Sequence, residues 1–154
     1  MLTDIPNGYD AIVRTYGELT PDFEARHLVV IDLPYPMTYT DEHGAHRITR
    51  TRCHRLAADN FLSALYAIRG KKLEGEANDF GGIYNNRTMR GRGVLPSTHS
   101  WGIAIDLEPA RFPLGSKDRL PDAVVECFRK AGFFYGGDFK TRLDPQHFQL
   151  ARGY

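Results

Sequence analysis

The chain has 154 residues, close to the usual size of one domain, so we expect a single domain over residues 1–154. Its composition, 42% hydrophobic and 25% charged, supplies enough apolar material for one core. The formal net charge of +1 argues against a protein built to bind nucleic-acid phosphates, because no large basic excess is present.

Targeting signals and cysteine usage add further expectations. The N-terminal residues lack the basic start and the apolar stretch of a secretory signal, so we expect synthesis in the cytoplasm. No apolar run is long enough to span a bilayer, so stable membrane insertion is not expected. The two cysteines, Cys53 and Cys127, are far apart and in no metal-binding spacing, which indicates two buried or half-buried thiols.

Three elements are expected in the first half of the chain. Residues 27–33 (HLVVIDL) are rich in β-branched side chains and predict a short strand, which the prolines that follow should end. Residues 47–52 alternate weakly and predict a second, more exposed strand. Residues 56–69 place apolar side chains at helical spacing, with Gly70 as the expected C-terminal cap.

The second half predicts three strands and one helix. Residues 81–86 are a possible strand that leads into a loop rich in arginine and glycine. Residues 102–107 (GIAIDL) and 147–150 (HFQL) predict two strands with alternating apolar and polar positions. Residues 121–131 predict a helix with proline in its first turn and basic residues in its last. Two helices among scattered strands favour the α+β class over a wound parallel sheet.

The polar faces of the last two strands carry candidate metal ligands. Asp106 shares its face with Ala104, whose small side chain leaves room for a ligand to reach a metal. His147 lies on the face of the final strand that also carries Gln149, and His99 lies in the loop before Asp106. Imidazole and carboxylate are ordinary zinc ligands, and a catalytic zinc needs three protein ligands and one open position. A lone histidine is usually structural, so only the combination of the three is informative.

These residues also carry a resemblance to a known family. Residues 97–106 (STHSWGIAID) show the pattern SxHxxGxAxD, and residues 144–148 (DPQHF) show DxxHF. This pair resembles the two-part signature of the zinc D-alanyl-D-alanine carboxypeptidase and L-alanyl-D-glutamate peptidase family, many of whose members are phage endolysins. The resemblance covers residues 84–150. It implies a small α+β domain, mostly antiparallel sheet with packed helices, of the zinc D-Ala-D-Ala peptidase or Hedgehog type.

The resemblance implies a role for each of four residues. The family's three metal ligands fall on His99, Asp106 and His147, which would hold one Zn²⁺ per chain. Its general base falls on Asp144. A carboxylate three residues before a metal-bound histidine can reach the attacking water, which zinc activates, and pass its proton to the leaving amine.

Three further positions match the family less specifically. Arg87 matches an arginine that stabilises the developing oxyanion or holds a substrate carboxylate, with Arg90 and Arg92 as nearby rivals. Ser97 matches a residue that helps to hold the substrate backbone. Asp138 matches a recurring position and is expected either to orient a ligand histidine from behind or to be a plain turn residue.

The function implied is hydrolysis of peptidoglycan stem peptides, with the L-Ala–D-Glu endopeptidase favoured over a D-Ala-D-Ala carboxypeptidase. A catalytically silent zinc-binding module is the alternative of another class. Without a signal peptide or a separate cell-wall-binding module, the chain suits a compact phage lysis enzyme. We then expect a monomer that acts at the cell wall or in the periplasm after release, with a holin as the possible partner in that release.

Overall fold

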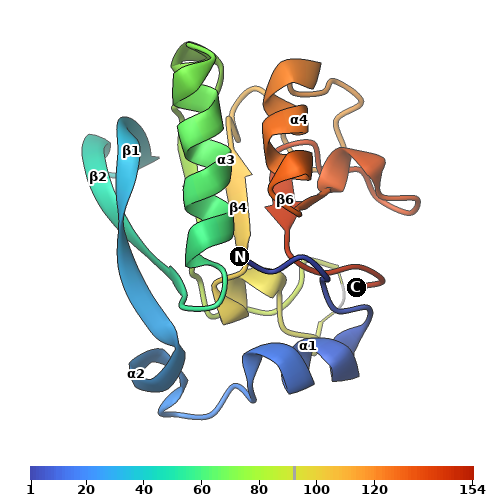
Figure 1. Ribbon diagram of the computed structural model, residues 1–154. Coiled ribbons are helices and arrows are strands. Elements are labelled where there is room, and N and C mark those ends of the chain that lie inside the picture. Colours follow the sequence, from blue (N-terminus) through green and yellow to red (C-terminus); the bar gives the residue numbers. More distant parts are fainter. Residues whose placement is uncertain (92) are drawn as a thin grey trace.

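The computed structural model describes residues 1–91 and 93–154 and confirms the α+β class, with only antiparallel strand pairing within its two sheets (Figure 1). One sheet is a hairpin of β1 (Leu28–Asp41) and β2 (Gly44–His54). The other has the strand order β3-β4-β6-β5, with the bounds Phe80–Gly82, Ala104–Leu107, His147–Gln149 and Phe134–Tyr135 in that order. The α-helices are α1 (Tyr9–Tyr16), α2 (Phe23–His27), α3 (Ala58–Gly70) and α4 (Asp122–Lys130), and the 3-10 turns are η1 (Glu74–Glu76), η2 (Thr98–Trp101) and η3 (Gly136–Asp138).

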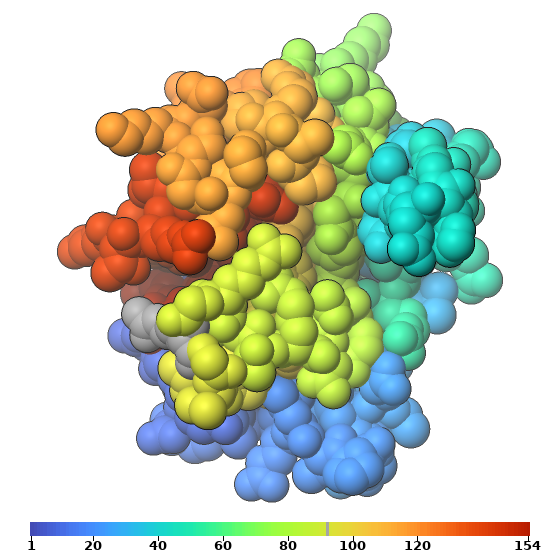
Figure 2. Space-filling view, turned by 180° about the vertical axis from the view of Figure 1, so that it is seen from behind, coloured from blue at the N-terminus to red at the C-terminus, as the bar shows by residue number. Residues whose placement is uncertain are grey.

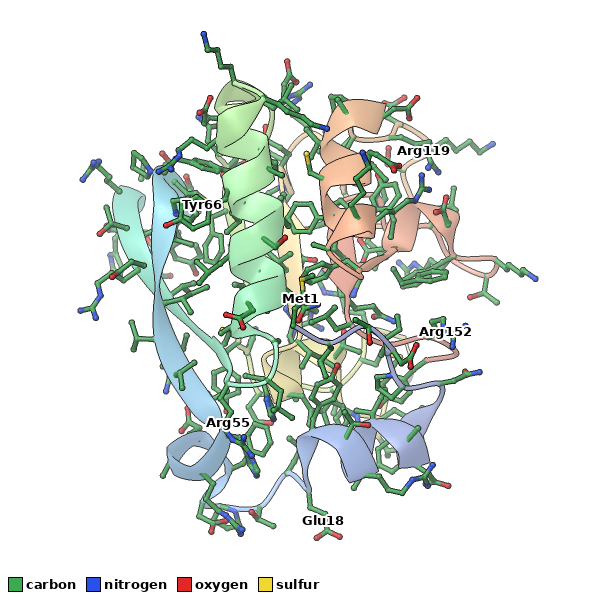
Figure 3. The ribbon with its side chains drawn as sticks, viewed as in Figure 1. Met1, Glu18, Arg55, Tyr66, Arg119 and Arg152 are labelled. Carbon is green, nitrogen blue, oxygen red and sulfur yellow. The ribbon has the colours of Figure 1, made fainter. Side chains whose placement is uncertain are left out.

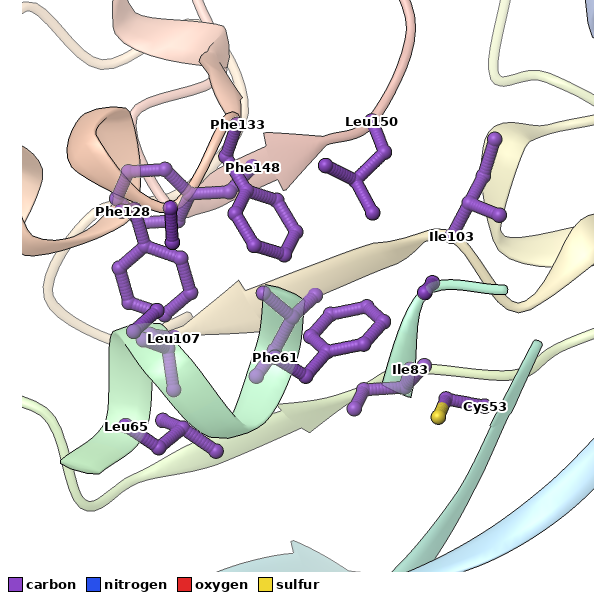
Figure 4. Packing of buried hydrophobic residues seen from close by; sticks show 14 of the residues in the cluster. Cys53, Phe61, Leu65, Ile83, Ile103, Leu107, Phe128, Phe133, Phe148 and Leu150 are labelled. Atoms are coloured by element: carbon purple, nitrogen blue, oxygen red, sulfur yellow. The ribbon is translucent and has the colours of Figure 1, made fainter. Parts of the chain in front are cut away.

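The core lies between the four-stranded sheet and the two long helices, α3 and α4. Phe61 of α3 and Phe128 of α4 are fully buried, and Phe128 stacks on Phe148 of β6 with ring centroids 4.1 Å apart (Figure 4). Ile103, just before β4, and Leu107, the last residue of β4, point into the same layer and are also fully buried. Burying each such side chain stabilises the fold by about 1.5–3 kcal/mol, so this layer holds β4 and β6 firmly in place.

The opposite face of the sheet carries the polar side chains. Because side chains alternate along a strand, the burial of Phe148 in the core turns His147 and Gln149 to the other side. In the register of β4 with β6, Asp106 lies opposite His147 and Ala104 lies opposite Gln149. The sheet therefore brings together two candidate ligands that are 41 positions apart in the sequence.

The prediction that the prolines end the first strand is wrong. β1 continues through Pro34 and Pro36 as far as Asp41. The pairing with β2 shifts between Asp32 and Met37, so both prolines fall in an irregular stretch of a strand that has only one partner in its sheet. Proline is tolerated at such a place because no ladder hydrogen bond from its nitrogen is required.

Other boundaries differ by a few residues. The two predicted helices are confirmed as α3 and α4, but Gly70 is the last residue of α3 and Lys71 is its cap. The strand expected at 81–86 is the shorter β3. The elements that the sequence pattern missed are α1, α2 and β5, of which the last two are too short to show a period. Both cysteines are free and buried, as expected. Within the described ranges, no helix has the length and apolar character to cross a membrane.

A buried histidine at the end of β2 ties three segments together. The Nε2 atom of His54 donates a hydrogen bond to the Tyr16 carbonyl at 2.8 Å, and its Nδ1 accepts one from the Leu56 amide at 3.1 Å. The bond from Leu56 needs the neutral ring, because Nδ1 can accept only while it carries no hydrogen. Burial is the main cause that lowers the pKa of His54 from 6.5 to about 4, and the nearby charges of His27 and Arg55 lower it further, while the bond to Tyr16 opposes the shift.

This histidine should make the fold sensitive to mild acid. Between pH 6.5 and about 4 the unfolded chain binds a proton that native His54 excludes, so stability is full above this window and falls as the pH drops through it. Between about pH 7.5 and pH 5 this group should remove about 2 kcal/mol from the free energy of unfolding, measured by urea denaturation. His54→Gln should be less stable than the wild type at about pH 7.5. Its free energy of unfolding should fall less than that of the wild type between about pH 7.5 and pH 5. An equal loss in both proteins would contradict the assignment.

Candidate metal and catalytic site

Three short segments converge to form a cluster of possible metal ligands. His99 comes from η2, Asp106 from β4 and His147 from β6. Each offers one ligand atom, and these atoms all lie within 4.8 Å of one another. Gly102 ends η2 with a φ of 70°, a left-handed conformation that suits glycine and turns the chain into β4.

The ring of His99 is oriented by the main chain. Its Nδ1 lies 2.7 Å from the Ile83 carbonyl oxygen, which can only accept, so the hydrogen sits on Nδ1. The Nε2 atom then keeps its lone pair and lies 3.2 Å from Oδ2 of Asp106. This nitrogen is buried and has no hydrogen-bond partner among the described residues.

The ring of His147 is oriented by side chains. Its Nε2 lies 2.9 Å from Oε1 of Gln149 and 3.4 Å from the hydroxyl of Thr98. Its Nδ1 points the opposite way, 2.9 Å from Oδ1 of Asp106 and 3.9 Å from Oδ2 of Asp144. Nδ1 of His147 and Nε2 of His99 therefore both face the carboxylate of Asp106.

This donor set fits a zinc ion. Two imidazole nitrogens and one carboxylate oxygen match zinc's preferred ligands, and three protein ligands leave a position for water or substrate. The unpartnered Nε2 of His99 is the atom that a metal would satisfy, because a buried polar atom without a partner is costly. The sequence-predicted ligands thus lie together in a geometry that can hold the metal.

The electrostatics of the cluster also favour a cation. Burial alone would raise the pKa of Asp106, but the neighbouring rings of His99 and His147 outweigh burial and hold that pKa well below its ordinary value. Burial alone would lower the pKa of His147, but Asp106 and Asp144 outweigh it and raise that pKa. The carboxylate is therefore ionised at neutral pH, and the cluster attracts positive charge.

Asp144 lies at the edge of the cluster without joining it. Its Oδ2 is 3.9 Å from Nδ1 of His147, too far for a hydrogen bond, and its Oδ1 is buried without a hydrogen-bond partner in the described residues. Burial is the main cause that raises the pKa of Asp144, and the charge of Asp106 adds to it. Its backbone amide donates to the Gly136 carbonyl at 2.9 Å. A carboxylate oxygen is thus held free beside the ligands.

A cavity of about 530 Å³ opens in front of these side chains. Asp106, Asp144 and His147 line one part of it, and the cationic side chains around it in the described part of the chain are Arg87, Arg90, Lys140, Arg142 and Arg152. Figure 2 shows the hollowed face where the yellow-green segment before η2, the orange segment after β4 and the red segment after η3 meet. Such a volume suits a small peptide rather than a single ion.

Arg87 and Arg90 both line the cavity, and the charge of Arg90 lowers the pKa of Asp144, although burial outweighs it. The Arg87 main chain is fixed by hydrogen bonds to Ser97 and Ser100, and its guanidinium donates to the Thr88 carbonyl at 3.2 Å. The third rival, Arg92, lies outside the described residues.

Ser97 and Asp138 have structural contacts that the sequence pattern did not reveal. The Ser97 hydroxyl oxygen accepts a hydrogen bond from the His99 amide at 3.2 Å and caps η2, and the residue also lines the cavity. Asp138 pairs with Arg119 at 3.1 Å and with Arg129 of α4 at 2.6 Å. Figure 3 shows Arg119 beside α4. The expected contact between Asp138 and a ligand histidine is absent from the described part of the chain, because other groups orient both rings.

The sequence pattern did not identify the residues that orient the rings of His99 and His147. Gln149 was placed on the face of His147 by the alternation of the last strand, and this placement is the only signal that pointed to it. The carbonyl of Ile83 and the hydroxyl of Thr98 had no signal, because each depends on how a loop folds back on the sheet.

A comparison with known protein families supports the assignment of this site. Residues 90–150 match a family described as D-alanyl-D-alanine carboxypeptidase, a span that contains His99, Asp106, Asp144 and His147 but starts after Arg87. The resemblance inferred from the sequence pattern is therefore confirmed over this part of the chain. No curated protein matches the sequence significantly.

A glycine in β3 leaves the space in which Asp106 sits. A Cβ at Gly81 would lie 2.7 Å from the Asp106 Cβ and 3.1 Å from its carbonyl oxygen, so Gly81→Ala must displace the carboxylate or the strand. We expect Gly81→Ala to weaken zinc binding about tenfold or more and to lower stability by about 1–3 kcal/mol, measured by chelator competition and urea unfolding. The control is Gly75→Ala, where a Cβ meets nothing within 4 Å. Zinc binding by Gly81→Ala equal to that of the control would contradict this role.

Proposed function

We propose that this chain, whose residues 90–150 match a family described as D-alanyl-D-alanine carboxypeptidase, is a zinc-dependent peptidase that hydrolyses peptidoglycan stem peptides between L-Ala and D-Glu. The observation that carries the proposal is the buried cluster of His99, Asp106 and His147, with the free carboxylate of Asp144 beside it at the wall of a peptide-sized cavity. A silent zinc-binding module would need neither that free carboxylate nor that cavity.

Different residues of the chain have different roles in peptide hydrolysis. When bound, zinc supplies a Lewis acid that polarises a carbonyl and lowers the pKa of a coordinated water toward about 7. Asp144 accepts the proton of the attacking water on its unpaired oxygen and returns it to the leaving amine. His99, Asp106 and His147 would hold the metal next to the Asp144 side chain, and the ring orientations described above turn a nitrogen lone pair of each histidine toward Asp106.

The charges around the cavity favour an acidic substrate. Among the described residues, five cationic side chains line it, and Asp138, which also lines it, is already paired with Arg119 and Arg129. D-Glu in the stem peptide carries a free α-carboxylate next to the scissile bond. A guanidinium of Arg87 or Arg90 can bind that carboxylate through two hydrogen bonds and so orient the carbonyl toward the metal.

A second candidate is removal of the terminal D-Ala from the stem peptide. The description of the matched family names this reaction, and the same arginines could hold the C-terminal carboxylate of D-Ala. The two reactions share ligands and base and differ in where the peptide extends beyond the scissile bond. Product masses therefore separate them.

Replacement of the proposed base tests the mechanism. Asp144→Asn should keep one zinc per chain but lower kcat by about 10²–10⁴, because the amide cannot accept the proton. Asp138→Asn is the matched control, since Asp138 lines the same cavity but is paired with two arginines, and we expect its kcat to stay near that of the wild type. Steady-state kinetics and elemental analysis measure both. Full turnover by Asp144→Asn with loss in Asp138→Asn would move the base to Asp138.

Single substitutions decide between the two arginines. Arg87→Ala should lower kcat/KM by about 10²–10³ if its guanidinium meets charge that develops in the transition state. Arg87→Lys should recover only part of this loss, because an ammonium cannot form the two parallel hydrogen bonds. The comparison is Arg90→Ala under the same conditions. Loss of activity in Arg90→Ala alone would assign the role to Arg90.

The bond that is cut tests the substrate directly. Zinc-loaded protein incubated with Gram-negative peptidoglycan should release peptides that begin with D-Glu, identified by mass spectrometry of the products. The control is Asp144→Asn, which should release these peptides about 10²–10⁴ times more slowly at the same concentration. Loss of a single alanine from the pentapeptide end, with the L-Ala–D-Glu bond intact, would replace the endopeptidase by the carboxypeptidase.

A further inference from the structure

One buried polar side chain at the site has no part in the hydrolysis described above. Gln149 is 2% exposed and lies behind His147, on the same face of β6. Its Oε1 is 2.9 Å from Nε2 of His147. An amide oxygen can only accept, so this contact places the hydrogen of a neutral His147 on Nε2 and leaves the Nδ1 lone pair turned toward Asp106.

The orientation of the Gln149 amide is fixed by its other contacts. Its Nε2 donates to the main-chain oxygens of Ala151 at 3.2 Å and Tyr154 at 3.4 Å, and the Thr98 hydroxyl donates to its Oε1 at 3.1 Å. A flipped amide would set its oxygen against two main-chain oxygens that cannot donate, so both of these hydrogen bonds would be lost. The network therefore admits one orientation, with the acceptor facing His147.

The two ligand histidines differ in how they are held. His99 is oriented by the carbonyl of Ile83, which belongs to the main chain and is present whatever the side chain. His147 is oriented by a side chain, so a substitution can remove its acceptor. Without that acceptor, the ring could place its hydrogen on Nδ1 and donate it to Asp106, and that nitrogen would then be closed to a metal.

We propose that Gln149, held by Thr98, is a positioning residue that fixes His147 in the Nε2–H form and so presents Nδ1 to zinc. The inference rests on the metal site of the proposed function. Beyond that function, we infer that the zinc affinity of the site depends on Gln149, a side chain that does not touch the metal. Partners of this kind behind a metal ligand typically contribute about 10–100-fold to metal affinity.

Two substitutions separate positioning from general support of the fold. Gln149→Leu removes the acceptor for His147, whereas Gln149→Glu restores an acceptor oxygen, and both remove the donors to Ala151 and Tyr154. Both variants should therefore lose stability in urea unfolding. Only Gln149→Leu should raise the dissociation constant for zinc, by about 10–100-fold, measured by competition with a chromophoric chelator. Gln149→Glu should recover most of that affinity.

A matched control and a spectroscopic readout complete the experiment. Gln146→Leu changes another buried glutamine, whose amide donates to the Phe112 carbonyl at 3.3 Å, and it should leave zinc affinity within about threefold of the wild type. In the zinc-loaded wild type, ¹⁵N–¹H correlation spectra should show the hydrogen of His147 on Nε2.

The outcomes distinguish the two proposals. Zinc affinity that follows stability equally in Gln149→Leu and Gln149→Glu would overturn the positioning role and leave the proposed function standing. Wild-type affinity in Gln149→Leu, or a hydrogen on Nδ1 of His147 in the zinc-loaded protein, would do the same. Failure of the wild type to bind zinc would overturn the proposed function, and the positioning role with it.

Discussion

The site depends on the register between β4 and β6. In this register Asp106 lies opposite His147, and their side chains meet at 2.9 Å. A slip of one residue would turn Asp106 into the core and Ile105 out of it, because side chains alternate along a strand. Ile105 and Phe148 are fully buried on the core face, so hydrophobic packing penalises that slip. The geometry of the polar cluster is thus set by the apolar residues between its members.

Burying the polar atoms of the cluster costs stability, and only some of these atoms regain a hydrogen bond in the fold. Atoms that orient the rings all have partners: Nδ1 of His99 bonds to the Ile83 carbonyl, and Nε2 of His147 bonds to Gln149. Two atoms at the site have no hydrogen-bond partner among the described residues, Nε2 of His99 and Oδ1 of Asp144. These are the two atoms assigned to metal binding and to proton transfer. An unsatisfied buried atom costs stability, which is a common feature of functional sites.

Strand alternation made the sheet-borne part of the site predictable from the sequence. The pattern of GIAIDL placed Asp106 opposite the core, and HFQL did the same for His147 and Gln149. The loops were not predictable in this way, because their side chains follow no period. The contacts of Asp138 with Arg119 and Arg129 depend on how η3 packs beside α4, and the path of β1 through its prolines depends on a shift of pairing with β2. Family resemblance named Asp138 but could not say what it touches.

The acidic and basic side chains of the site lie in different places, and this separation favours one orientation of a bound peptide. Asp106 and Asp144 concentrate negative charge at the metal cluster, whereas Arg87, Arg90 and Lys140 bring positive charge to the walls of the cavity. Bound zinc would offset the negative charge of the cluster, so the remaining positive charge of the site lies on the walls, and a substrate carboxylate is attracted there. The carbonyl of the scissile bond carries no net charge and is then left to face the metal. A peptide with an acidic group close to its scissile bond would thus be drawn into the orientation that hydrolysis requires.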